Sequence, residues 1–172
     1  MNRHSKSISA RTVSVCGILA ALALIFSYIE AILPLSTGIP GVKLGVANLA
    51  VVVALYLYGF PFALFVNLIR ILIAGLLFNG LFGAVYSLAG GMLSLFFMVL
   101  LKKTNLFSVA GISMAGGVAH NLGQLMVAAL IISNIKLFYY FPVLLFAGMV
   151  SGILMGILAH FILQKLSRAI SK

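Results

Sequence analysis

Long apolar segments, separated by short breaks in which Pro, Gly, Asn or Lys cluster, make up most of the chain. A helix needs roughly 20 apolar residues to cross a hydrocarbon core of about 30 Å. We predict membrane helices at residues 12–33, 44–59, 61–78, 81–101, 108–133 and 138–166. The second is short, and the breaks leave no room for a soluble module. The predicted fold is an all-α bundle of six transmembrane helices, with residues 1–172 forming a single transmembrane domain.

The composition agrees with a chain that lies in a lipid bilayer. Charged residues are 7% of the chain, whereas about 25% is usual for a soluble domain. The chain has eleven Lys and Arg residues but a single acidic residue, Glu30, and its net charge is +10. The basic residues are spread in ones and twos between apolar runs, which is typical of membrane-helix flanks and not of a nucleic-acid-binding face. We expect a multi-pass protein of the cell membrane with no nucleic-acid partner.

The basic residues also predict an orientation, because Lys and Arg are enriched on the cytoplasmic side. With a cytoplasmic N-terminus, the inner side holds Arg3, Lys6, Arg11, Lys102, Lys103, Lys165, Arg168 and Lys172. The outer side holds only Lys43 and Lys136. Both termini are therefore predicted to be cytoplasmic. The connection PLSTGIPGVK (34–43) then lies outside, where its prolines and glycines make it a candidate lid or, equally, a plain connector.

Polar side chains interrupt two of the predicted helices at mid-depth. The stretch GGVAHNLGQLM (116–126) contains His120, Asn121 and Gln124. At about 100° per residue, His120 and Gln124 share a helix face and Asn121 lies a third of a turn away. Arg70 lies near the middle of the helix predicted at 61–78, one turn after Asn67. Ionisable residues are costly in lipid, so they usually face protein or a water-filled cavity and serve a function.

The depths of these groups are compatible with one binding site. From the start of each helix, Arg70 lies about 13 Å in, His120 about 18 Å in and Glu30 about 27 Å in. Together with Lys43 at the outer mouth, they form a series from mid-membrane to the outer surface. The candidate substrate-binding residues are Arg70, His120, Asn121, Gln124, Lys43 and Glu30, with Asn48 and Asn79 as weaker candidates for the wall. The positive local charge favours an anionic or carbonyl-rich small molecule.

A structural role is the alternative for these polar groups. Asn and Gln often join membrane helices through hydrogen bonds worth about 1 kcal/mol. That role is as good an interpretation for Asn67 and Asn121 as ligand binding, and an Arg70–Glu30 pair is a further structural possibility. For Arg70 and His120 together we favour a ligand site. No second His, Cys or carboxylate stands at metal-ligand spacing from His120, so we expect neither a metal nor a cofactor.

Small residues recur at four-residue spacing on three predicted helices, and such stripes let helix backbones approach closely. An inward-facing stripe packs the bundle, whereas an outward-facing one docks another membrane protein. The sequence does not distinguish the two. The stripes are Gly148-xxx-Gly152-xxx-Gly156, Gly83-xxx-Ser87-xxx-Gly91 and, near the start of the first helix, Cys16-xxx-Ala20 with Gly17-xxx-Ala21.

Four blocks of the sequence resemble a known family. VKLGVANLAVVVALYLYGF, LIRILIAGLLFNG, SLAGGMLSL and AHNLGQLMVAALI follow in an order similar to that of the Gx transporters, a family also labelled heptaprenyl diphosphate synthase component I. The resemblance runs from about Ser14 to Leu166, and KLGVAN and HNLGQ are its most specific parts. The family is similar to the S components of energy-coupling factor (ECF) transporters, which are six-helix membrane proteins that bind a micronutrient from outside.

The resemblance implies partners. S components pair with a transmembrane coupling protein and two cytoplasmic ATPases. By resemblance, Gly17, Ala20 and Ala21 contact the coupling protein, although Gly17-xxx-Ala21 is looser than the alanine pair common in S components. The resemblance also implies a substrate site near the outer face, capped by the first loop.

The synthase label conflicts with the residues present. Prenyl diphosphate synthases hold Mg²⁺ and diphosphate with clustered aspartates, since hard cations need several oxygen ligands. This chain has no Asp and one Glu, and it lacks a Walker sequence for gripping a nucleotide. We therefore expect no enzyme activity of its own and favour a substrate-binding transporter subunit. The alternatives are a non-catalytic membrane accessory in isoprenoid, prenyl diphosphate or quinone metabolism, and a structural scaffold.

Overall fold

The computed structural model describes residues 10–32 and 45–170, which are almost entirely helical and contain no strand. The prediction of an all-α fold is confirmed. A helix lies at each of the six predicted positions, with bounds shifted by a few residues. In chain order the elements are α1 (Ala10–Ile32), α2 (Val46–Tyr58), α3 (Phe60–Ala74), the π-helical turn η1 (Gly75–Asn79), α4 (Gly80–Thr104), α5 (Val109–Ile132), the 3₁₀ helix η2 (Ile135–Tyr140) and α6 (Phe141–Ile170).

Five of these helical segments are long and apolar enough to cross a membrane. They are α1, α3 with η1, α4, α5, and η2 with α6. The remaining helix, α2, has 13 residues and is only about 20 Å long. A multi-pass membrane protein follows from these lengths and compositions. The sixth span and the cytoplasmic side of the termini stay predictions.

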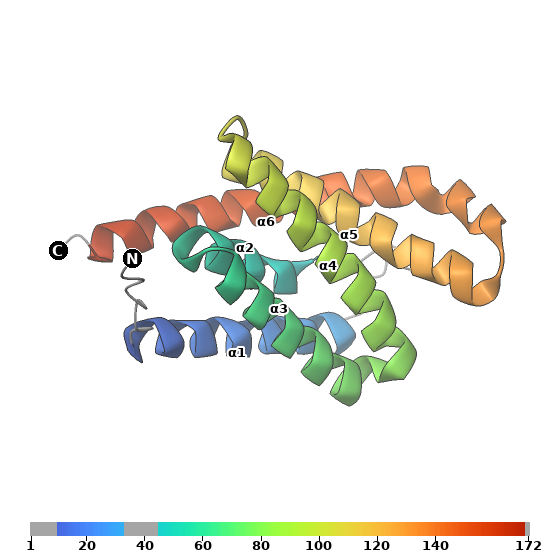
Figure 1. Ribbon diagram of the computed structural model, residues 1–172, viewed down its shortest axis with the longest axis horizontal. Helices are drawn as coiled ribbons and strands as arrows, with labels where there is room; N and C mark the ends of the chain where they lie inside the picture. Colours follow the sequence, from blue (N-terminus) through green and yellow to red (C-terminus); the bar gives the residue numbers. More distant parts are fainter. Residues whose placement is uncertain (1–9, 33–44, 171–172) are drawn as a thin grey trace, which may run out of the picture.

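The short helix α2 lies in the centre of the bundle. Every residue from Leu49 to Leu55 is buried, and α2 packs against α1, α3 and α6. Figure 1 shows α2 between α1 and α6, with the Ala10 end of α1 and the Ile170 end of α6 at the same end of the molecule. This burial explains why the segment VANLAVVVALYLY is apolar on all sides.

The last turn of α2 is held by a cation from α4. Lys102 Nζ donates a 2.6 Å hydrogen bond to the carbonyl of Leu55 and lies 4.6 Å from the centre of the Tyr56 ring. The same carbonyl also accepts a 3.2 Å bond from the N–H of Gly59, and the C-terminus of a helix attracts positive charge. Lys102 therefore ties the end of α4 to the end of α2.

Glycine makes two helix connections unusually short. Gly59 between α2 and α3 has a φ of 85°, and Gly80 between η1 and α4 has a φ of 66°. Side chains strain a backbone in this left-handed region, so glycine is favoured. Pro61 follows in the first turn of α3, as predicted, where its missing N–H leaves no bond unmade. Successive helices therefore turn back on each other without a loop.

Glycines also set how closely α4, α5 and α6 cross. A Cβ atom on Gly123 of α5 would lie 2.8 Å from the Ala89 carbonyl oxygen of α4. A Cβ atom on Gly152 of α6 would lie 2.7 Å from the Ser113 carbonyl oxygen of α5. The stripe 148/152/156 therefore faces α5 and packs the bundle. Gly17 on α1 differs, because a Cβ atom there would meet nothing within 4 Å.

Candidate substrate-binding site

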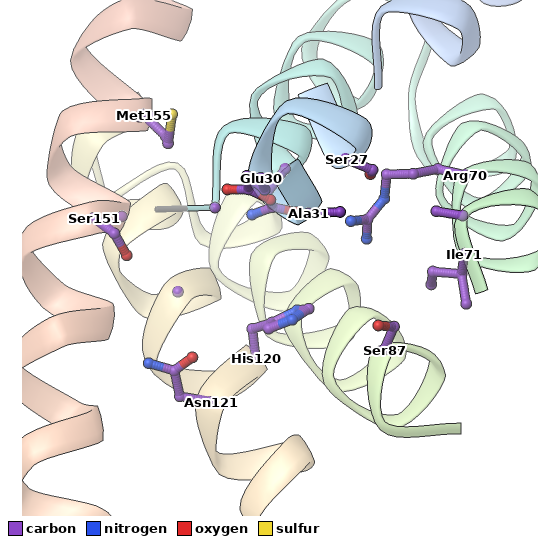
Figure 2. Close-up of a pocket in the computed structure, with 15 residues that line it drawn as sticks. Ser27, Glu30, Ala31, Arg70, Ile71, Ser87, His120, Asn121, Ser151 and Met155 are labelled. Carbon is purple, nitrogen blue, oxygen red and sulfur yellow. The ribbon is translucent and has the colours of Figure 1, made fainter. Parts of the chain in front are cut away.

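A cavity of about 250 Å³ lies among the helices, in the half of the bundle away from the Ala10 end of α1 (Figure 2). In the predicted orientation this is the outer half. The cavity collects residues from α1, α3, α4, α5 and α6 and from the start of α2. Five of the predicted site residues line it together, namely Glu30, Asn48, Arg70, His120 and Asn121.

Arg70 supplies the positive charge of this cavity. Its side chain is 8% exposed, and its Nη2 donates a 2.8 Å hydrogen bond to Oδ1 of Asn67, one turn earlier on α3. Asn67 is fully buried, so the guanidinium is fixed from one side. In Figure 2 the guanidinium points away from α3 into the shared space, and its Nε has no hydrogen-bond partner in the described part of the chain. The guanidinium is therefore a charged donor group at the cavity wall, and such a group can pair with an anionic guest.

The carboxylate of Glu30 is held by backbone and not by Arg70. Its Oε1 accepts a 2.8 Å hydrogen bond from the N–H of Val46, the first residue of α2. The first N–H groups of a helix lack intrahelical partners, and the helix dipole favours negative charge there. Between the described residues no ion pair joins Glu30 to Arg70, although the two charges attract each other across the cavity. The charge of Glu30 is therefore partly compensated by α2.

His120 reaches the cavity from the middle of α5. Its side chain is half-buried, and Figure 2 shows the ring extending from α5 toward the space that Arg70 enters. A Cβ atom on Gly90 of α4 would lie 3.1 Å from Cδ2 of the ring, so the absence of a side chain at Gly90 leaves the ring its place. An imidazole and a guanidinium therefore line one cavity. That this cavity binds a ligand stays a prediction.

Asn121 lines the cavity and also joins α5 to α6. Its Nδ2 donates a 2.7 Å hydrogen bond to the Leu144 carbonyl oxygen of α6, and the side chain is 8% exposed. A Cβ atom on Gly148 would lie 3.0 Å from Nδ2, so a larger residue there would crowd the bond. The amide nitrogen of Asn121 has the interhelical role that was the alternative to ligand binding.

Of the other three predicted site residues, Gln124 lies elsewhere and two fall outside the described part of the chain. Gln124, one turn after His120, lines a second and more apolar cavity of about 510 Å³ between α4, α5, η2 and α6. Lys43 and the candidate lid at 34–43 lie outside the described residues. Asn79 ends η1, and its side chain is outside the described part as well.

Three serines that are not among the predicted site residues complete the polar wall. Ser27, Ser87 and Ser151 all line the 250 Å³ cavity. Ser27 stands three residues before Glu30, on the same face of α1, and this spacing is a signal that the sequence does contain. Ser87 belongs to the small-residue stripe of α4 and Ser151 precedes Gly152, so both are hidden among packing residues.

The sequence profile of the family described as heptaprenyl diphosphate synthase component I matches residues 19–162, most of the chain. The chain belongs to the heptaprenyl diphosphate synthase component I family. No curated protein matches the sequence. The region matched to the family contains every residue that lines the cavity.

The small residues of α1 divide between the inside and the outside of this family member. Ala20 is 5% exposed and packs in the apolar core. Gly17 and Ala21 are exposed on the side of the same helix that faces away from the bundle. Of the three residues predicted to contact a coupling protein, two are therefore accessible and one lies inside.

Proposed function

We propose that the chain is the substrate-binding subunit, or S component, of an ECF-type uptake transporter for a small anionic or carbonyl-rich micronutrient or cofactor precursor. The observation that carries this proposal is the setting of Arg70. Its permanently charged side chain is 8% exposed, in a helical segment long and apolar enough to cross a membrane. Such a charge is costly in lipid and is typical of substrate pathways. Because Arg70 lines the cavity, an anionic guest there would pair with its charge.

The other cavity residues suit non-covalent capture. Asn48, His120, Ser27 and Ser87 bring hydrogen-bonding groups to the cavity. The hydroxyl of Ser151 already donates to the Gly148 carbonyl, and Glu30 is engaged with the start of α2. Guanidinium, imidazole and hydroxyl donors complement the oxygens of a carboxylate, a phosphate ester or a ring carbonyl. A capture subunit needs only this complementarity, and in this proposal ATP is hydrolysed by partner subunits.

The exposed side of α1, which faces away from the bundle, supports a docking role. Gly17 and Ala21 are exposed at adjacent turns, and small residues allow a partner helix to approach closely. We assign this face to a transmembrane coupling protein that is associated with two cytoplasmic ATPases. Ala20 supports that face from within the core and does not contact the partner in this proposal.

The description of the family favours a second candidate, a non-catalytic membrane accessory in prenyl diphosphate or quinone metabolism. The chain has a single acidic residue, too few oxygen ligands for a Mg²⁺–diphosphate centre. It would therefore assist a separate catalytic protein. Affinity purification from native membranes discriminates the two, since the transporter role requires ATPases in the eluate and the accessory role requires a prenyl-transferring enzyme.

The test is native mass spectrometry of purified wild-type protein, Arg70→Met and the exposed control Lys103→Met. We expect a small molecule to co-purify with wild type and Lys103→Met but not with Arg70→Met. All three should fold, and Arg70→Met should melt only slightly earlier, because Asn67 loses its partner. An Arg70→Met variant that retains the molecule yet melts early would show that Arg70 holds helices together and would refute the binding role.

A further inference from the structure

The second cavity, of about 510 Å³, has a different chemistry from the first. Its wall is largely apolar and comes from α4, α5, η2 and α6. Leu125 and Leu144 are buried in it, whereas Tyr140 at its edge is 56% exposed. The cavity therefore reaches the surface near Tyr140 and offers an apolar guest a largely apolar wall.

The two cavities adjoin. Ser87 of α4 and Asn121 of α5 line both of them. Along α5, His120 lines only the charged cavity and Gln124, one turn later, lines only the apolar one. A single guest that occupied both cavities would place a charged end beside Arg70 and extend past Ser87 and Asn121 toward Leu125. Ligand sites usually occupy about 300–1,000 Å³, a range that the charged cavity alone does not reach.

We infer that the substrate is amphiphilic, with a compact anionic head at Arg70 and a hydrocarbon portion in the apolar cavity. This inference rests on the proposed function and narrows its substrate class. The head is set by the guanidinium of Arg70, which lines the charged cavity together with His120. The hydrocarbon portion is set by the apolar wall, which a purely polar micronutrient would leave empty or filled by lipid. Straight, branched and cyclic hydrocarbons share the required chemistry.

The test uses ethyl, butyl, hexyl and octyl phosphate as probes. Binding to the full-length protein in lipid nanodiscs is measured by calorimetry. Burying one methylene is worth about 0.8 kcal/mol, so affinity should rise about fourfold per added methylene until the cavity is filled. Ala128→Leu places extra bulk on the wall of the apolar cavity, whereas Ala129→Leu changes the next residue of α5, which lines neither cavity.

We expect Ala128→Leu to abolish the rise with chain length while ethyl phosphate still binds, and Ala129→Leu to behave as wild type. If the affinity of wild type did not change with chain length, and binding were still lost in Arg70→Met, the amphiphilic substrate would be refuted. The proposed function would remain. An unchanged rise in Ala128→Leu would place the hydrocarbon in the bilayer and also overturn the inference.

Binding that survives Arg70→Met would instead refute the proposed function. If no alkyl phosphate binds, this substrate class is wrong, and the co-purified molecule still tests the function.

Discussion

The Oε1 atom of Glu30 accepts a 2.8 Å hydrogen bond from the backbone N–H of Val46, which joins the end of α1 to the first residue of α2. This bond assigns the only acidic residue of the chain to a helix start. Arg70 is then the positive charge of the cavity, and Glu30 offsets it only across a distance, without an ion pair between them. Glu30 is thus a positioning residue in this account, and substitution tests that role directly.

We expect Glu30→Ala and Glu30→Gln to differ in stability. Alanine removes the bond to Val46 and should lower the free energy of unfolding by about 1–3 kcal/mol, whereas glutamine keeps an acceptor and should lose less. Both remove a negative charge near Arg70, so affinity for butyl phosphate should rise about fivefold, or roughly 1 kcal/mol. Thermal unfolding and calorimetry measure the two effects. Loss of butyl phosphate binding in both variants would show that Glu30 contacts the ligand itself.

The bond between Arg70 Nη2 and Asn67 Oδ1 provides a second prediction. Asn67→Asp keeps the shape of the side chain and places a carboxylate about 2.8 Å from the guanidinium. This fixed anion should compete with an anionic ligand and lower affinity for butyl phosphate at least about tenfold, or 1.4 kcal/mol. Asn105→Asp makes the same change at an exposed position beyond the cavity and should bind normally. Equal affinities in the two variants would contradict the role of Arg70.

Uniform apolarity limited what the sequence could predict about α2. The apolar runs, together with Gly59, Gly80 and Pro61, mark where helices begin and end. However, a short spanning helix and a short buried helix have the same composition. The central burial of α2 depends on packing by α1, α3 and α6, which only the tertiary structure supplies.

The candidate site was predicted in part for a similar reason. Helical spacing placed His120 and Gln124 on one face of α5, but that face borders both cavities. His120 lines the charged cavity, and Gln124, one turn later, lines the apolar one. The Asn121 bond depends on Leu144, distant in sequence, and on the missing side chain of Gly148. Arg70 and Glu30 were identifiable because ionisable residues in apolar helices are rare.

The glycine crossings make a prediction about stability. Gly123→Ala puts a methyl group 2.8 Å from the Ala89 carbonyl oxygen and should cost about 1–3 kcal/mol through overpacking. Gly17→Ala meets nothing within 4 Å and should be neutral or stabilising by up to about 1 kcal/mol. Because the chain has no Trp, thermal unfolding is followed by circular dichroism. Similar melting temperatures for the two variants would show that α4 and α5 separate more easily than the crossing implies.

The orientation is tested by cysteine labelling on intact cells. Cys16 is buried, and Cys16→Ser removes it as background. In that background, Ser36→Cys should react with an impermeant maleimide, because the basic residues predict that residues 34–43 lie outside. Leu106→Cys, between α4 and α5 and 81% exposed, should react only after lysis. The reverse pattern would invert the topology and put the charged cavity in the inner half.

The two faces of α1 make the last prediction, which concerns the coupling protein. Ala21→Leu adds bulk to an exposed position and should prevent close approach of a partner helix. We expect it to abolish co-purification with the coupling protein and ATPases, with normal melting and normal butyl phosphate binding. Ala20→Leu changes a core residue that is 5% exposed, so it should lower stability by about 1–3 kcal/mol. If Ala21→Leu still assembles fully, the exposed face of α1 meets lipid, and the coupling protein docks elsewhere or is absent.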